Sequence, residues 1–209
     1  MDQRHSPEDF KNKLWETFGE MNRDIFFNSA ATRFTLFRQS SRETDHIVPW
    51  YRYRRDMNGP EHPFQEAQQS KAKYKRGESV TGKTWEREHA GKDLFFVWFP
   101  EFRGRQEFEN YYRETLQIPV DVVDGISDYM IRVQAIFSYA FLGVGKQLLS
   151  VLSLDLQTKT RISEDGLFLE LEGKILGTNA MAFFFRRLQG ILETVTIESL
   201  TEWQPNQYL

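Results

Sequence analysis

Residues 77–84 have the types and spacing of a phosphate-binding loop. Gly77-x-x-x-x-Gly82-Lys83-Thr84 is a formal match to a pattern in which backbone N–H groups and a lysine hold nucleotide phosphates. Such a loop must follow a buried strand inside a βαβ unit. Here it follows residues 68–76, which are dominated by polar and charged side chains. We therefore favour a glycine-flanked turn, and a nucleotide-handling enzyme acting through Gly77–Thr84 is kept as an alternative hypothesis.

Basic side chains gather in two places that could hold an anion. Lys71-Ala72-Lys73-Tyr74-Lys75-Arg76 is a basic run with one aromatic residue, and Arg52, Arg54 and Arg55 end a predicted strand. Guanidinium groups bind phosphate and carboxylate through paired hydrogen bonds, which would suit an anionic ligand. The other two interpretations are a nucleic-acid surface and a solvated loop. A net charge of −3 argues against a nucleic-acid binder.

Several other kinds of site find no support in the sequence. The chain has no cysteine, so thiolate metal sites, iron–sulfur clusters and cysteine nucleophiles are excluded. The histidines are His5, His46, His62 and His89, and none has a metal-ligand spacing to another. No nucleophile-elbow pattern is present. We therefore expect no metal site, no catalytic residue and no cofactor.

Length and composition indicate one folded domain over residues 1–209. Hydrophobic residues make up 40% of the chain and aromatic residues 15%, enough for a full core. The first residues lack the apolar segment of a signal peptide. Apolar runs such as Leu94–Phe99 are far shorter than the ~20 residues that span a bilayer. We expect a soluble, cytoplasmic protein without membrane contact.

Capping and periodicity signals divide the chain into elements. Ser6 has the position of an N-cap and Pro7 that of the first helical residue, which predicts a helix over about 7–23. Pro49 predicts an edge or a bulge in its strand. The other predicted elements are strands over 33–38 and 46–54, short helices over 64–71 and 81–88, a strand over 94–99, a helix over 107–116, a strand hairpin over 131–156 and a helix over about 178–198.

The last helix is apolar on more than one side. One stripe, spaced by three and four residues, consists of Met181, Phe184, Leu188, Ile191 and Val195. Phe183 and Phe185 lie outside that stripe. A helix that is apolar on two sides usually packs against two partners. We therefore expect a homodimer through the terminal helices, with Phe184 and Ile191 in the contact.

The element order predicts an α+β fold, with a central antiparallel sheet and amphipathic N- and C-terminal helices packed on one face. Two stretches also resemble GAF domains: Gly77–Glu86 resembles their glycine-containing turn, and 137–155 resembles their closing hairpin. The resemblance implies a small-molecule pocket on the sheet face opposite the terminal helices, roofed by the short helix after the turn. It is incomplete, because the usual proline of the penultimate strand is replaced by Ala140-Phe141-Leu142 and the Asn-Lys-Phe-Asp-Glu signature of cyclic-nucleotide GAF domains is not found.

The resulting hypothesis is a non-catalytic GAF-like module that senses a small molecule, mediates dimerisation or partner binding, or does both. The output would come from a separate protein. The residues expected at the ligand are Arg52, Arg54, Lys75, Trp85, Phe96, Trp98 and Tyr139. A purely structural assembly module, with the pocket position filled by packing, is the alternative.

Overall fold

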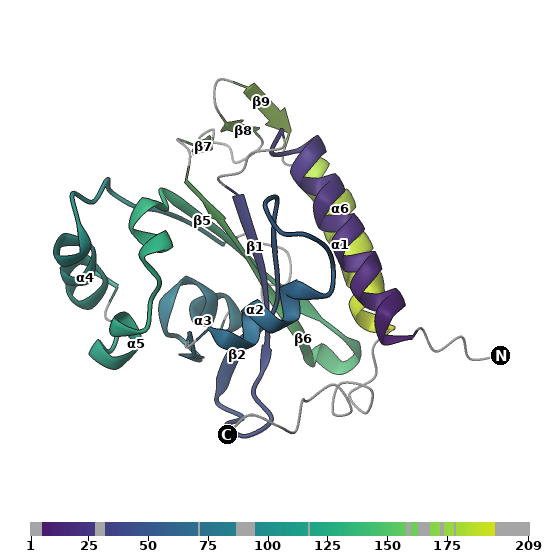
Figure 1. Ribbon diagram of the computed structural model, residues 1–209, viewed down its shortest axis with the longest axis horizontal. Helices are drawn as coiled ribbons and strands as arrows, with labels where there is room; N and C mark the ends of the chain where they lie inside the picture. The colour runs from purple at the N-terminus through teal and green to yellow at the C-terminus, as the bar shows by residue number, and fades with distance from the viewer. Residues whose placement is uncertain are drawn as a thin grey trace.

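The computed structural model describes residues 6–27, 32–70, 72–86, 95–116, 118–157, 160–162, 168–171, 174–177 and 179–194. A six-stranded sheet forms the centre of this part of the chain, with two long helices on one face and shorter helices on the other (Figure 1). The α+β fold predicted from the sequence is confirmed, with the terminal helices on a single face of the sheet. No helix among these residues has the length and apolar character needed to cross a bilayer.

The central sheet is antiparallel at every pairing. Its strands are β1 (Thr32–Gln39), β2 (His46–Arg54), β3 (Tyr74–Lys75), β4 (Phe95–Trp98), β5 (Ala135–Leu142) and β6 (Leu148–Leu156), in the spatial order β3-β2-β1-β6-β5-β4. Leu36 pairs with Tyr51 and Phe37 with Pro49, so Trp50 is the extra residue of a bulge. The bulge predicted from Pro49 is therefore confirmed.

The first helix, α1 (Pro7–Asp24), begins with a complete capping box. The Ser6 hydroxyl oxygen accepts a hydrogen bond from the Asp9 N–H, and the Asp9 carboxylate accepts one from the Ser6 N–H. An N-cap of this kind contributes about 1 kcal/mol. The helix buries Phe10, Leu14 and Phe18 against the sheet.

The terminal helix predicted over 178–198 is α6 (Asn179–Glu193), which lies alongside α1 and is joined to it by an Arg187–Glu20 ion pair.

These two helices and one face of the sheet form a single hydrophobic core, which we call the helix-side core. It contains Met181, Phe184, Leu188 and Ile191 of α6. Phe184 and Ile191, predicted in a dimer contact, are 6% and 8% exposed within one chain, so the chain's own packing buries them, and the homodimer stays a prediction. A stripe spaced by three and four residues faces whichever surface buries it, and here that surface is the chain's own sheet. Val195 lies outside the described residues.

The opposite face of the sheet is covered by short elements (Figure 1). They are α3 (Ser79–Glu86), α4 (Arg105–Glu114), α5 (Val120–Asp124) and a 3-10 helix, η2 (Asp128–Arg132). Helix α2 (His62–Gln69) packs on β2 and contributes to both sides, with Phe64 in the helix-side core and Glu66 on this face. The hairpin turn contains a second 3-10 helix, η3 (Val144–Lys146), and a small separate sheet is formed by β7 (Thr160–Ile162), β8 (Phe168–Leu171) and β9 (Lys174–Gly177). The sequence did not indicate β3, α5 or this second sheet.

The Gly77–Thr84 segment is a packed turn and helix. It follows the two-residue edge strand β3, which is antiparallel to β2, so no βαβ unit precedes it. Gly77 adopts a positive φ of 83°, and its N–H donates to the Gly82 carbonyl oxygen at 3.0 Å. A Cβ on Gly82 would lie 2.2 Å from the Lys75 carbonyl oxygen, so this position requires glycine for close approach. The phosphate-loop alternative is therefore wrong.

Candidate ligand-binding cavity

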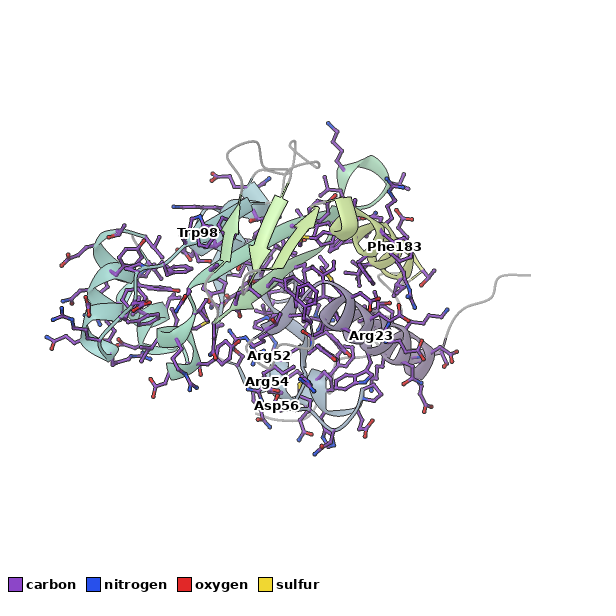
Figure 2. The ribbon with its side chains drawn as sticks, turned by 90° about the horizontal axis from the view of Figure 1, so that it is seen from above. Arg23, Arg52, Arg54, Asp56, Trp98 and Phe183 are labelled. Carbon is purple, nitrogen blue, oxygen red and sulfur yellow. The ribbon has the colours of Figure 1, made fainter. Side chains whose placement is uncertain are left out.

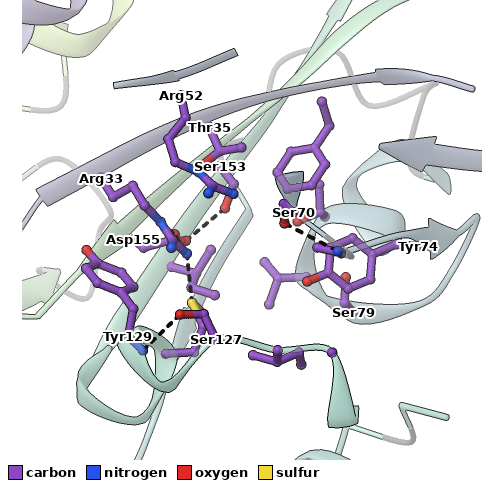
Figure 3. Close-up of a pocket in the computed structure, with 18 of the residues that line it drawn as sticks. Arg33, Thr35, Arg52, Ser70, Tyr74, Ser79, Ser127, Tyr129, Ser153 and Asp155 are labelled. Carbon is purple, nitrogen blue, oxygen red and sulfur yellow. Dashed lines mark hydrogen bonds and ion pairs between the residues drawn. The ribbon is translucent and has the colours of Figure 1, made fainter. Parts of the chain in front are cut away.

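A cavity of about 400 Å³ lies on the sheet face opposite the terminal helices. Its sheet wall is formed by β1, β2, β5 and β6, and its other walls by α2, α3, the end of α4 and the segment from α5 to η2 (Figure 3). The sheet residues that line it are Arg33, Thr35, Phe37, Arg52, Arg54, Ile136, Ser153 and Asp155. A cavity of this size falls within the range of small-molecule sites.

The polar side chains reach the cavity because strand residues alternate between faces. Phe34 and Leu36 of β1 enter the helix-side core, whereas Arg33 and Thr35 face the cavity. Strand β6 follows the same rule, with Leu154 in the core and Ser153 and Asp155 at the cavity. Strands that would ordinarily have one solvated face thus place charged and hydroxyl groups beneath a roof of helices.

Arg33 and Asp155 form the central ion pair of the cavity. They are direct partners in the β1–β6 register, and the guanidinium Nε and one Nη lie 2.7 and 2.5 Å from the same carboxylate oxygen. The Ser153 hydroxyl donates to the other oxygen at 3.1 Å. Burial alone would lower the pKa of Arg33, but Asp155 more than offsets this and raises it. Figure 3 shows the three side chains meeting on the sheet. Both carboxylate oxygens of Asp155 are therefore already in use.

Arg52 has a weaker set of partners. Its Nη1 lies 3.3 Å from Glu66 Oε1 on α2, and that oxygen is also 3.6 Å from an Nη of Arg54. The Nε of Arg52 is buried without a hydrogen-bond partner in the described part of the chain, and the side chain is only 11% exposed. Burial and then the charge of Arg33 lower the pKa of Arg52. The guanidinium of Arg52 is thus buried with less compensation than that of Arg33.

Hydroxyl groups around the two arginines also have unused hydrogen-bonding capacity. The side-chain oxygens of Thr35, Ser79 and Tyr112 are buried and have no hydrogen-bond partner among the described residues. Ser79, at the start of α3, has a positive φ of 56°, which is unfavourable for a residue other than glycine. Burial raises the pKa of Tyr74 to about 12 and that of Tyr112 far above its usual value, so both phenols keep their protons as donors.

Part of the cavity lining is apolar. Its side chains come from α3, β5 and the chain around α4 and α5, and they are Val80, Leu116, Ile118, Ile126 and Ile136. Most of them belong to a second hydrophobic cluster that also contains Phe108 and Val123. The cavity lining therefore combines charged side chains of the sheet with apolar side chains of the sheet and the short helices.

Two of the residues predicted at the ligand, Arg52 and Arg54, line this cavity. Lys75 is exposed and does not line it, although its neighbour Tyr74 does. Trp85 is buried in a separate cluster with Phe37 and Val151. The short helix that carries Trp85 does roof the cavity, but it does so through Ser79, Val80 and Thr81.

The predicted positions of Phe96, Trp98 and Tyr139 need correction. Phe96 and Tyr139 pack against the helix-side core, and Tyr139 stacks on Phe185 of α6 with ring centroids 4.6 Å apart. Trp98 contacts Phe96 on the edge strand and is 42% exposed. The reason is that the side chains of a strand alternate between its two faces. Tyr139 is on the same face of β5 as the core residue Phe137, whereas Ile136 is on the other face and lines the cavity. Aromatic content does not reveal which face of a strand a residue occupies.

Arg33 and Asp155, the most buried charges of the cavity, were not predicted from the sequence. A usable signal was present, because Arg33-x-Thr35 and Ser153-x-Asp155 place polar residues at period two within otherwise apolar strands. Among the described residues, no group of three or more His, Asp or Glu is arranged to hold a metal ion. The polar groups present suit hydrogen bonding and charge pairing with an organic molecule.

Comparisons with known proteins bear on the fold. The sequence matches no protein-family model and no curated protein. Among solved structures, the chain is similar to one of "the GAF domain", at 7% identity over 89% of this chain and 75% of that chain, with a TM-score of 0.46. It is also similar to the GAF domain of A. aeolicus nlh2 in an inactive state, at 14% identity over 88% and 81%, with a TM-score of 0.37. Both likenesses concern the fold alone.

Proposed function

We propose that this chain is a non-catalytic, GAF-like sensory or regulatory module that binds a small molecule in the cavity. The observation that carries the proposal is the buried Arg52 guanidinium, whose Nε has no hydrogen-bond partner in the described structure, at the wall of a cavity of about 400 Å³. Leaving such a group unsatisfied costs about 1–3 kcal/mol or more, and a bound molecule with acceptor atoms would remove that cost.

Several unpartnered groups and one strained residue lie at the cavity wall, and unpartnered groups also occur elsewhere in the described structure, at Thr17, Asn22, Thr32, Tyr51 and Arg113. Thr35, Arg52, Ser79 and Tyr112 all line the cavity and all have a buried polar atom without a partner among the described residues. A space that served only for packing would be lined mainly by apolar side chains. Unsatisfied polar atoms and a positive φ at the same wall support a binding site.

The lining residues support binding in preference to catalysis. They include serines, threonines, tyrosines and arginines, but no described lining residue is a histidine, lysine or cysteine. A serine nucleophile needs an adjacent general base, and the two carboxylates at the wall, Glu66 and Asp155, already pair with arginines. The phenols of Tyr74 and Tyr112 are weaker acids than usual, because burial raises their pKa values.

Helix α2 offers a route from the cavity to the helix-side core. Glu66 faces the arginines, whereas Phe64 on the same short helix packs edge-on against Tyr51 at 4.8 Å. The ammonium of Lys11 on α1 lies 5.3 Å from the centre of the Phe64 ring. A ligand that competes for Arg52 would release Glu66 and change how α2 packs on α1. This is the conformational readout we expect of the module, with a separate protein as its output.

Protein-detected NMR during titration with a chemically diverse set of metabolites tests the proposal. Binding should shift the backbone amide signals of Thr35, Ser79, Ser153 and Asp155 together, and should raise the unfolding temperature. Lys83→Ala serves as a control for the discarded phosphate loop and should respond as the wild type does. If no compound moves the cavity signals while the folded spectrum is intact, the binding function is wrong.

A second candidate, an assembly module, is favoured by one observation. Phe183 on α6 is 63% exposed, a large apolar side chain on the outside of the terminal helix pair (Figure 2). A homodimer that uses α6 would place this residue in its contact. Light scattering of the wild type and Phe183→Glu tests it: a dimer that becomes a monomer supports assembly, and a wild-type monomer at high concentration refutes the homodimer.

A further inference from the structure

The cavity discriminates between acceptor and donor groups of a ligand. Both oxygens of Asp155 accept hydrogen bonds, from Arg33 and from Ser153, and Glu66 is shared by Arg52 and Arg54. Both oxygens of Asp155 and Oε1 of Glu66 therefore already face donors of the chain. By contrast, Arg52 Nε and the hydroxyls of Thr35 and Ser79 have no partner in the described structure. Arg52 Nε can only donate, so a ligand group placed beside it has to accept a hydrogen bond, and the neighbouring hydroxyls can donate to the same group.

The charge balance singles out Arg52. Arg33 is neutralised by Asp155, and Arg54 has the exposed Asp56 at 3.4 Å in addition to Glu66 (Figure 2). Only Glu66, at 3.3 Å, stands against Arg52. Three arginines and two carboxylates line the wall, and Asp56 lies outside it with an exposed carboxylate that solvent screens, so the lining itself carries one positive charge. One negative charge on the ligand would complete the balance, and a second would face Glu66 and Asp155 without a cation of its own.

Part of the lining is apolar. Val80, Leu116, Ile126 and Ile136 also line the cavity, and against them a charged or strongly hydrated group would lose its water without compensation. An apolar body is favoured instead. The charged and the apolar side chains of the lining together favour a ligand with one compact anionic head and a hydrocarbon or aromatic body.

We propose, building on the binding function above, that the ligand is an amphipathic organic monocarboxylate. Its carboxylate accepts paired hydrogen bonds from Arg52 and bonds from the neighbouring hydroxyls, and it takes over from Glu66 as the partner of this guanidinium. Its body lies between α3 and the Ile126–Ile136 side of the cavity. The planar carboxylate matches the guanidinium fork, which distinguishes it from a tetrahedral dianion such as phosphate.

Calorimetric titration with matched probes tests the inference. The probes are acetate, butanoate, hexanoate, phenylacetate, the neutral amide phenylacetamide and inorganic phosphate. We expect phenylacetate to bind at least about tenfold more tightly than its amide. From acetate to hexanoate, the affinity should rise by up to about fourfold for each methylene added. Equal binding of acid and amide, or tighter binding of phosphate than of any carboxylate, would overturn the inference.

Three variants test whether Arg52 is responsible for the preference for the carboxylate over the amide. Arg52→Gln should abolish the preference for acid over amide, and Arg52→Lys should leave a smaller preference because it keeps the charge without the fork. Arg55→Gln, on an exposed neighbour of the same strand end, should keep the wild-type preference. The unfolding temperature of each free variant shows that it is folded, and Arg52→Gln removes a buried charge and so should not be less stable.

The same data separate this inference from the proposed function. If uncharged or cationic compounds move the cavity signals in the NMR titration and carboxylates do not, the cavity binds a ligand and the carboxylate assignment is wrong. If no compound of any class moves those signals, both fail. If Arg52→Gln still binds the acid more tightly than the amide, the ligand carboxylate does not bind to Arg52.

Discussion

Replacing Asp155 with asparagine should destabilise this protein strongly, because it leaves the buried Arg33 guanidinium without its counter-charge. The side chains of Arg33 and Asp155 are only 10% and 4% exposed, and two guanidinium nitrogens share one carboxylate oxygen at 2.7 and 2.5 Å. Removing one partner of a buried pair typically costs about 3–5 kcal/mol. The second arginine nearby, Arg52, adds repulsion once the carboxylate is lost. For a chain of this length, that loss lowers the unfolding temperature by about 6–20 °C.

The assay is urea unfolding followed by tryptophan fluorescence and circular dichroism, with a double-mutant cycle. Arg33→Met alone should also be costly, because it strands the Asp155 carboxylate. The double variant should be more stable than the sum of the single losses predicts, by about 1–3 kcal/mol. The matched control is Asp24→Asn, whose carboxylate also lies 2.7 Å from an arginine Nε but with partners 58% and 48% exposed. We expect no measurable change there, because solvent screens the pair.

Two results would refute this reasoning. A loss below about 1 kcal/mol for Asp155→Asn would mean that water or another group compensates Arg33. Strictly additive losses in the cycle would mean that the two side chains do not interact energetically in the folded protein.

Three further predictions rest on other parts of the fold. Gly82→Ala should cost about 1–3 kcal/mol, because its Cβ would clash with a backbone carbonyl oxygen, whereas Gly190→Ala, a helical glycine with nothing within 4 Å, should stabilise by up to about 1 kcal/mol in the same urea assay. Phe184→Glu should prevent folding and Phe183→Glu should not, as judged by circular dichroism, because the first is in the helix-side core and the second is exposed. Stability should fall as the pH rises from about 10 to about 12. Burial raises the pKa of Tyr74 to about 12, so the unfolded chain releases this proton first, and Tyr74→Phe should flatten part of that fall in the urea midpoint.

The sequence was sufficient for most local structure. The capping box at Ser6 and the spacing of Phe10, Leu14 and Phe18 indicate α1, and the predicted strand over 46–54 has the bounds of β2. These signals lie within a few residues of one another, so they need no knowledge of the rest of the chain. The glycines at 77 and 82 likewise predicted a turn, and the absence of a preceding buried strand argued correctly against a phosphate loop.

The candidate site depended on information that local spacing does not contain. Arg33 and Asp155 are 122 positions apart and meet only because β1 pairs with β6 in the middle of the sheet. Which face of each strand points toward the terminal helices was also undetermined, and Phe96, Trp98 and Tyr139 were consequently expected on the wrong side. A shift of one residue reverses every side chain of a strand. The sequence by itself determined the elements and their apolar stripes, whereas the strand order, the faces and the cavity between them were decided by long-range packing.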